Sequence, residues 1–95
     1  MTFIRLTIAR PHRGEEQHLE DLLRRLNDLV AGEPGVIQTF LARPHDDSGE
    51  LARIAIYADE AAADHLAVTD SVMALRSEMH LITEPGHVER AFHSI

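Results

Sequence analysis

The strongest constraint on the fold is a change of hydrophobic period near the start of the chain. Residues 3–9 alternate between two sets of side chains, whereas leucines in residues 19–30 recur at steps of three and four. A period of two is typical of a strand, and a period near 3.6 is typical of a helix with one buried face. Arg10, Pro11 and Gly14 separate the two patterns, and Glu15 and Glu16 favour a helix start. The sequence therefore predicts a strand followed by an amphipathic helix.

The rest of the sequence continues with further strands and one more helical stretch. Residues 36–43 and 51–58 are rich in β-formers, and the turn-forming segment 46–49 between them predicts a hairpin. Asp59 can cap a helix beginning at residue 60, and residues 69–71 are able to interrupt or recap it. Its expected core stripe is Val68, Val72, Leu75 and Met79. Residues 88–95 predict a last short strand.

This order of strand, helix, strand, strand, helix and strand predicts an α+β fold. We expect a ferredoxin-like βαββαβ sandwich, in which two helices cover one face of an antiparallel four-stranded sheet. Residues 1–95 form a single domain, because the chain is too short for two. A core of this size is marginal, so self-association is expected.

The composition excludes several classes of function. The chain has no cysteine and no lysine, which removes thiolate chemistry, cysteine-bound metals and Schiff-base catalysis. Its formal charge of -7 argues against a nucleic-acid partner. No apolar run long enough for a membrane span is present, and no secretory leader follows Met1, so we expect no membrane partner and a cytoplasmic location.

Strand parity predicts which side chains share a face of the sheet. The aliphatic sets Ile4, Leu6, Ile8 and Ile54, Ile56 suit the side that faces the helices. The opposite face would then carry a mixed set of side chains, namely Phe3, Arg5, Thr7, Leu51, Arg53, Ala55 and Tyr57. Such a face is too apolar for water and too polar for an ordinary core, so it should meet a second subunit, a ligand or both.

Four segments resemble the antibiotic biosynthesis monooxygenase family. They are 13–16 before the first helix, 33–35 before the second strand, the hairpin 43–49, and 57–61 running on to 65–66. The resemblance implies a dimeric α+β barrel, in which two ferredoxin-like subunits pack sheet to sheet. It also implies a cavity in each half, where some members oxidise phenols, anthrones or quinols with O2 and no cofactor. In this family the third strand usually ends in an aromatic residue, often Trp, where Tyr57 stands here, and a His lies at the place of His65.

Haem-degrading relatives of similar fold use an Asn on the first strand, and a Trp and a His on the second helix. Thr7, His65 and Leu75 stand at these places and match none of the three, so haem degradation is disfavoured. The resemblance therefore implies a homodimeric monooxygenase that acts without a cofactor on a small aromatic molecule. A non-enzymatic small-molecule-binding or stress-related module of the same fold is the main alternative, and an isomerase or lyase is a weaker one.

Two residues are the predicted catalytic groups. His65 can take a proton from a phenol, because imidazole exchanges protons near neutral pH, and the resulting anion can react with O2. The simpler alternative is a partly exposed helix residue that bonds a neighbour. The hydroxyl of Tyr57 can bond a substrate oxygen, or its ring can fill the dimer interface instead.

Four residues are the predicted substrate contacts. Arg5 and Arg53 can hold an oxyanion or a carboxylate, although an intersubunit ion pair is favoured for Arg53. Thr7 and Phe40 are predicted cavity lining, with a core position as the alternative for Phe40. A single-residue bulge would move Phe40 to the opposite face of the sheet.

A metal site is not predicted, although seven histidines invite one. His87, Glu89 and His93 share a face by parity, but the two histidines lie six residues apart, or roughly 20 Å on an extended strand. A structural role at a helix end is expected for His80.

Overall fold

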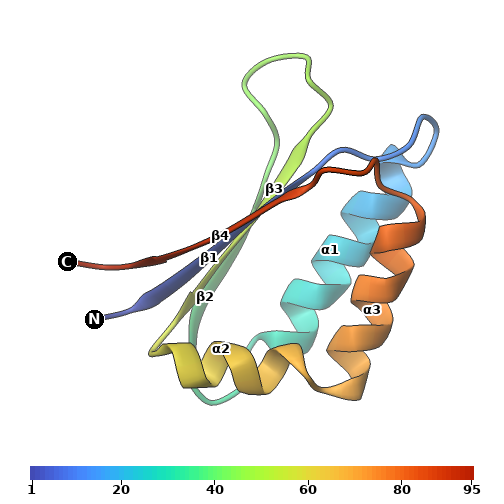
Figure 1. The fold of residues 1–95 in the computed structure, drawn as a ribbon. Coiled ribbons are helices and arrows are strands. Elements are labelled where there is room, and N and C mark those ends of the chain that lie inside the picture. The colour runs from blue at the N-terminus through green and yellow to red at the C-terminus, as the bar shows by residue number, and fades with distance from the viewer.

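The computed structural model describes residues 1–95, which form four strands and three helices (Figure 1). The strands are β1 (Phe3–Ala9), β2 (Val36–Ala42), β3 (Leu51–Tyr57) and β4 (Val88–His93). The helices are α1 (Glu16–Val30), α2 (Glu60–Ala67) and α3 (Asp70–Leu81). All neighbouring strands are antiparallel, and the sheet order is β2-β3-β1-β4. The predicted α+β ferredoxin-like fold is confirmed.

The helices all lie on one side of the sheet, where α1 and α3 run side by side and α2 crosses one end (Figure 1). The leucine stripe of α1 forms the centre of the core. Leu19 and Leu22 are fully buried, and Leu23 and Leu26 are nearly so. The other sheet face has no helix over it, which leaves the two faces in different surroundings.

The second helical stretch is divided rather than continuous. As predicted, Asp59 caps α2, and its Oδ1 accepts a hydrogen bond from the backbone N–H of Ala62 at 2.9 Å. At the other end, the hydroxyl of Thr69 donates to the carbonyl of Leu66 at 2.9 Å, and a new helix starts at the next residue. Val68 lies in this break with 68% of its surface exposed, so its predicted place on the core stripe is wrong.

The predicted assignment of the two sheet faces is also wrong. Arg53, Ala55 and Tyr57 of β3 are buried beneath the helices, and their β1 partners Thr7, Arg5 and Phe3 share that side. The aliphatic side chains are on the open face instead: Ile4, Leu6, Ile8, Ile54 and Ile56. Parity correctly grouped each set, but greater hydrophobicity did not identify the helix side. The small Ala55 and the long apolar stems of arginine allow a mixed face to pack under helices.

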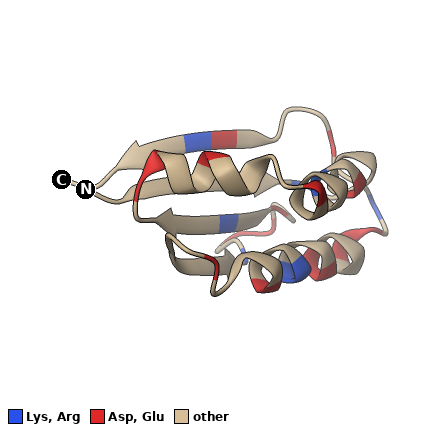
Figure 2. Ribbon diagram, turned by 90° about the horizontal axis from the view of Figure 1, so that it is seen from below, with Lys and Arg blue, Asp and Glu red and all other residues tan.

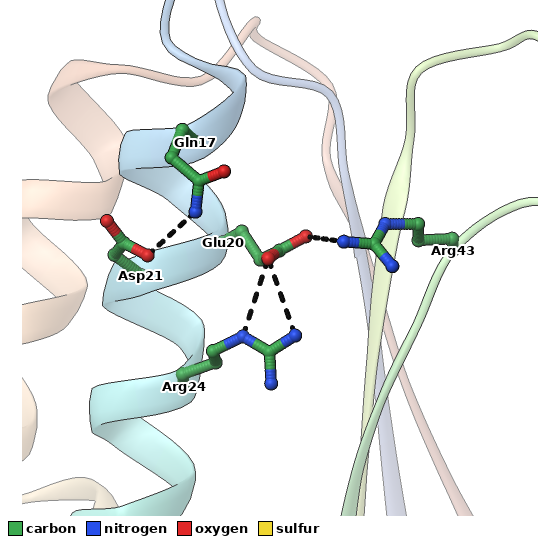
Figure 3. Close-up of polar contacts among 5 residues, drawn as sticks. All are labelled: Gln17, Glu20, Asp21, Arg24 and Arg43. Carbon is green, nitrogen blue, oxygen red and sulfur yellow. Dashed lines mark hydrogen bonds and ion pairs between the residues drawn. The ribbon is translucent and has the colours of Figure 1, made fainter.

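Two contacts tie the helix layer to the sheet. Glu20 of α1 accepts from Arg24 Nη2 at 3.4 Å, and from Arg43 Nη2, just beyond β2, at 2.7 Å (Figure 3). At the other end, Gly35 before β2 packs so closely on α2 that a Cβ there would lie 2.5 Å from the Cβ of Ala62. Its φ of +85° also favours glycine.

Candidate functional site

A cavity lies between the sheet and the helices. The cavity has a volume of about 70 Å³ and is partly open to solvent. Its apolar walls include Leu19, Leu23, Leu26, Val30, Leu66, Val72 and Met79. Its polar lining is Arg5, Thr7, Arg53, Tyr57, Arg76, His80, Thr83, His87 and Glu89. An apolar pocket with a few convergent polar groups is the usual form of a small-molecule site.

Arg53 of β3 is the most buried charged side chain of this site, with 7% of its surface exposed. Its Nε donates to Asn27 Oδ1 of α1 at 2.6 Å, and no carboxylate pairs with it. Burial lowers the pKa of the Arg53 guanidinium below its ordinary value, while the nearby Tyr57 hydroxyl opposes this shift. Because Arg53 lies under the helices, the predicted ion pair with a partner subunit at a barrel rim is wrong.

The three other strand residues predicted to share a face with Arg53 also line the cavity. The buried Tyr57 has Phe3 beside it, with ring centroids 6.5 Å apart, so it belongs to this subunit's own core rather than to the open face. Arg5 Nη2 lies 3.5 Å from Asp64 Oδ1 of α2, and Thr7 adjoins Arg53 across the β1–β3 pairing. Parity therefore brought together Arg5, Thr7, Arg53 and Tyr57 correctly.

Two histidines and an ion pair form one side of the cavity. His80 near the end of α3 and His87 before β4 meet edge to face, with ring centroids 5.1 Å apart. Glu89 Oε1 lies 2.8 Å from Arg76 Nη2 and 3.8 Å from His87 Nε2. This side of the site can therefore exchange protons, because imidazole serves as acid or base near neutral pH.

Two predicted site residues do not reach the cavity. His65 is exposed in the last turn of α2 and does not line the cavity, and its catalytic role stays a prediction. Phe40 pairs with Ile54 on the open face and is 44% exposed, so both its predicted cavity position and its core alternative are wrong. A register shift between Val36 and Gln38 produces this result, because it reverses the parity of the remainder of β2.

Sequence reasoning missed Asn27, Arg76 and the His80–His87 contact. Strand parity had placed His87 with Glu89, but nothing in the local pattern linked them to α3. His80 does lie near a helix end as expected, yet it also lines the cavity. Packing of α3 beside the start of β4 creates this side of the site, and that packing has no local sequence signal.

Two further features concern the whole chain. No three histidine, aspartate or glutamate side chains converge in a way that could hold a metal ion. None of the three helices combines the length and the apolar composition needed to cross a bilayer.

Comparison with solved structures shows the same fold in distant relatives. A conserved protein from Methanosarcina mazei Go1 superposes with a TM-score of 0.93 at 12% identity, covering 100% of this chain and 94% of that one. Rv0793 from Mycobacterium tuberculosis superposes with a TM-score of 0.91 at 16% identity, covering 100% of this chain and 96% of that one. SnoaB from Streptomyces nogalater, a cofactor-independent oxygenase crystallised as the N63A mutant, gives 0.87 at 16% identity, covering 98% and 92%.

No curated protein sequence matches the chain. The family model described as antibiotic biosynthesis monooxygenase matches residues 2–76, which include β1, α1, the β2–β3 hairpin, α2 and the first half of α3. The matched region thus holds the floor of the cavity and most of its walls. The chain belongs to the antibiotic biosynthesis monooxygenase family.

Proposed function

We propose that this protein is a cofactor-independent monooxygenase that oxidises a small phenolic or quinol-type molecule with O2 inside the cavity. The observation that carries the proposal is the buried Tyr57 hydroxyl beneath apolar helix side chains, in a chain of this family. Apolar walls of this kind can pack against a flat aromatic ring, and the Tyr57 hydroxyl can hold its oxygen. Arg5, Thr7 and Arg53 are the proposed further substrate contacts.

The reaction begins with loss of the phenolic proton, which produces an electron-rich anion. The anion gives electrons to O2 and forms a carbon–oxygen bond to it at a ring carbon that bears hydrogen. The O–O bond of the resulting peroxide then breaks, leaving a carbonyl on the ring and releasing water. For 1-naphthol the balance is one naphthol and one O2 giving one 1,4-naphthoquinone and one water. The substrate supplies all the electrons.

An imidazole is the proposed proton acceptor. The sequence points to His65, but His80 and His87 line the cavity. Their position within reach of a bound ring makes them the stronger choice on geometry, because a general base must approach the proton that it removes. Glu89, 3.8 Å from His87 Nε2, is placed to stabilise the imidazolium that forms.

A homodimer is the proposed assembly, with a second copy covering the open sheet face. Three side chains on this face each expose about two fifths of their surface, namely Phe40, Val88 and Phe92. They extend the aliphatic patch of β1 and β3. A continuous apolar patch of this kind is unusual on a monomer. The same surface occurs on every copy, so it can pack against itself about a twofold axis.

Oxygen uptake with 1-naphthol tests the proposed reaction. We expect one O2 consumed per quinone formed, and one ¹⁸O atom in the new carbonyl when ¹⁸O2 is supplied. Tyr57→Phe should lower the rate about tenfold or more, because it loses the hydroxyl while keeping the ring. Binding of phenols without oxygen uptake or quinone would reject the proposal and favour the non-enzymatic alternative.

Three histidine variants and one control then locate the base. His87→Gln or His80→Gln should slow oxidation about 100-fold, which is typical of the loss of a general base. His45→Gln, on the exposed 43–50 loop, is the matched control and should leave the rate unchanged. A loss confined to His65→Gln would instead assign the role to His65.

A further inference from the structure

The charge inside the cavity is opposite to the charge of the protein. The chain has nine arginines, no lysine and 16 acidic residues, which give it a net charge of -7. Three of the arginines line the cavity, namely Arg5, Arg53 and Arg76, against the single carboxylate of Glu89. Most acidic residues lie on the helices and the connecting loops (Figure 2). The cavity is therefore a positive site within a negative molecule.

The three arginines differ in how their charges are balanced. Arg76 is paired with Glu89 at 2.8 Å, and Arg5 has Asp64 at 3.5 Å. Arg53 has only neutral polar neighbours, namely Asn27, at 2.6 Å through Nε, and the Tyr57 hydroxyl. Its positive charge is thus the one in the cavity without a partner of opposite sign.

The guanidinium of Arg53 also keeps free donors. No buried side-chain nitrogen in the protein lacks a hydrogen-bond partner, and Arg53 has two neutral polar neighbours, Asn27 on Nε and the Tyr57 hydroxyl, which leaves some of its five N–H donors free. Its terminal nitrogens must therefore have open space beside them, which the cavity provides. Two such nitrogens form the planar fork that binds a carboxylate through two parallel hydrogen bonds.

A buried cation without a partner costs stability, because desolvation is not offset by attraction to a neighbouring anion. The charges of Arg5 and Arg76 act on Arg53 with the same sign and add to this cost. A bound anion would remove it. Apolar walls beside the fork would hold the remainder of such a ligand.

We propose that the cavity binds an aromatic carboxylate, with the carboxylate on the terminal nitrogens of Arg53 and the ring against the apolar side chains of α1 and α3. This inference deepens the proposed function, because it specifies a charged group that the substrate carries in addition to its phenol. The carboxylate carries its negative charge before any reaction, so Arg53 binds the unreacted substrate.

Calorimetry with 2-naphthoate and 2-naphthamide tests the proposal. The two probes have nearly the same shape and differ by one negative charge, and neither has a phenol that could be oxidised. We expect 2-naphthoate to bind at least about tenfold more tightly, which corresponds to about 1.4 kcal/mol. It should also raise the melting temperature more than the amide does.

The Arg53→Met variant should abolish this preference, so that the two probes bind within about twofold of each other. Arg53→Gln, which keeps a donor for Asn27 but not the charge, should do the same and guards against a packing effect of methionine. Arg5→Met removes a cavity arginine that already has a carboxylate nearby, and it should reduce the preference by less than about threefold. Arg24→Met, on the exposed side of α1, is the control for net charge and should change nothing.

Equal affinity of the two probes for the wild-type protein would overturn the proposal. So would absence of 2-naphthoate binding at 1 mM (roughly -4 kcal/mol), or a preference that survives in both Arg53 variants. Oxidation of 1-naphthol and 1-hydroxy-2-naphthoate distinguishes this inference from the proposed function. Equal kcat/KM for the two would reject the carboxylate site and keep the proposed oxygenase activity. Binding of 2-naphthoate without oxidation of either phenol would keep the carboxylate site and reject the proposed oxygenase activity.

Discussion

The two faces of the sheet are covered in the opposite way to what their hydrophobicity suggests. The face under the helices carries two arginines, a threonine and a tyrosine, whereas the face without helices carries isoleucine and leucine. A polar group under helices is useful only where it lines a cavity, and an apolar group outside is stable only where another surface covers it. Each face therefore suits the partner that we propose for it, a ligand under the helices and a second copy on the open side.

The largest effect is expected from a charge placed on the open face. Ile54→Glu should weaken the proposed dimer at least about 100-fold, or about 2.7 kcal/mol, because it would bury an unpaired carboxylate between the sheets. Size-exclusion chromatography with light scattering measures the change in mass, and circular dichroism checks the fold.

Val68→Glu is the matched control, since it adds the same charge to an exposed apolar residue in the α2–α3 break. It should leave the mass of the assembly unchanged. A wild-type protein that is monomeric at all concentrations would contradict the role given to the open face.

The helix-covered face depends on the docking of α2, which Gly35→Ala should disturb. We expect a loss of about 2 to 4 kcal/mol in the free energy of unfolding, because the added Cβ meets Ala62 and the positive φ is unfavourable for alanine. Urea denaturation measures this loss. Gly14→Ala, which has a similar φ but open space, should cost only about 1 kcal/mol. Equal losses would show that the contact with α2 is unimportant.

Two alanines of β3 test the packing of each face separately, because they lie on opposite sides of the sheet. In the monomeric Ile54→Glu background, Ala55→Leu should cost about 1 to 3 kcal/mol by overpacking the helix-covered core. Ala52→Leu on the open face should change the stability by less than about 0.5 kcal/mol. Thermal and urea unfolding measure both values, and the reverse order would restore the face assignment first expected from the sequence.

The smallest effect is expected from the cap of α2. Asp59→Ala removes the hydrogen bond to the Ala62 amide and should cost about 1 kcal/mol. Asp28→Ala, an exposed aspartate within α1, should stay within about 0.5 kcal/mol of the wild type. Chemical denaturation resolves the two variants, and an unchanged Asp59→Ala would mean that solvent replaces the cap.

The order of strands and helices could be predicted, because each hydrophobic repeat is formed by residues close together in the sequence. β1 has the predicted bounds, and β2, β3 and β4 end one or two residues earlier than predicted. The choice of face could not be predicted, because both faces carry apolar side chains next to polar ones or at the surface, so hydrophobicity alone does not separate them. Phe40 was misplaced for a local reason, since a bulge has no signature in the alternation itself.

About half of the candidate site was predictable, and for a physical reason. Arg5, Thr7, Arg53 and Tyr57 share a side of two paired strands, and parity preserves that relation whichever face is covered. Arg76, His80 and His87 come together only when α3 packs near the start of β4. A contact of this kind depends on how a helix packs against a strand far away in the sequence, and a single sequence carries little information about that packing.

The break between α2 and α3 lies at the wall of the cavity. Leu66 and Ala67 on one side of the break and Val72 on the other line the cavity, while Thr69 terminates one helix and the next residue begins another. A short helix with its own cap can shift as a unit without unwinding its neighbour. Entry of the proposed ligand would then depend on a local displacement of this eight-residue helix rather than on global unfolding. Because α2 is short and buries only Ala63 and Leu66, its amides should also exchange with solvent faster than those of α1, which has 15 residues and five buried ones.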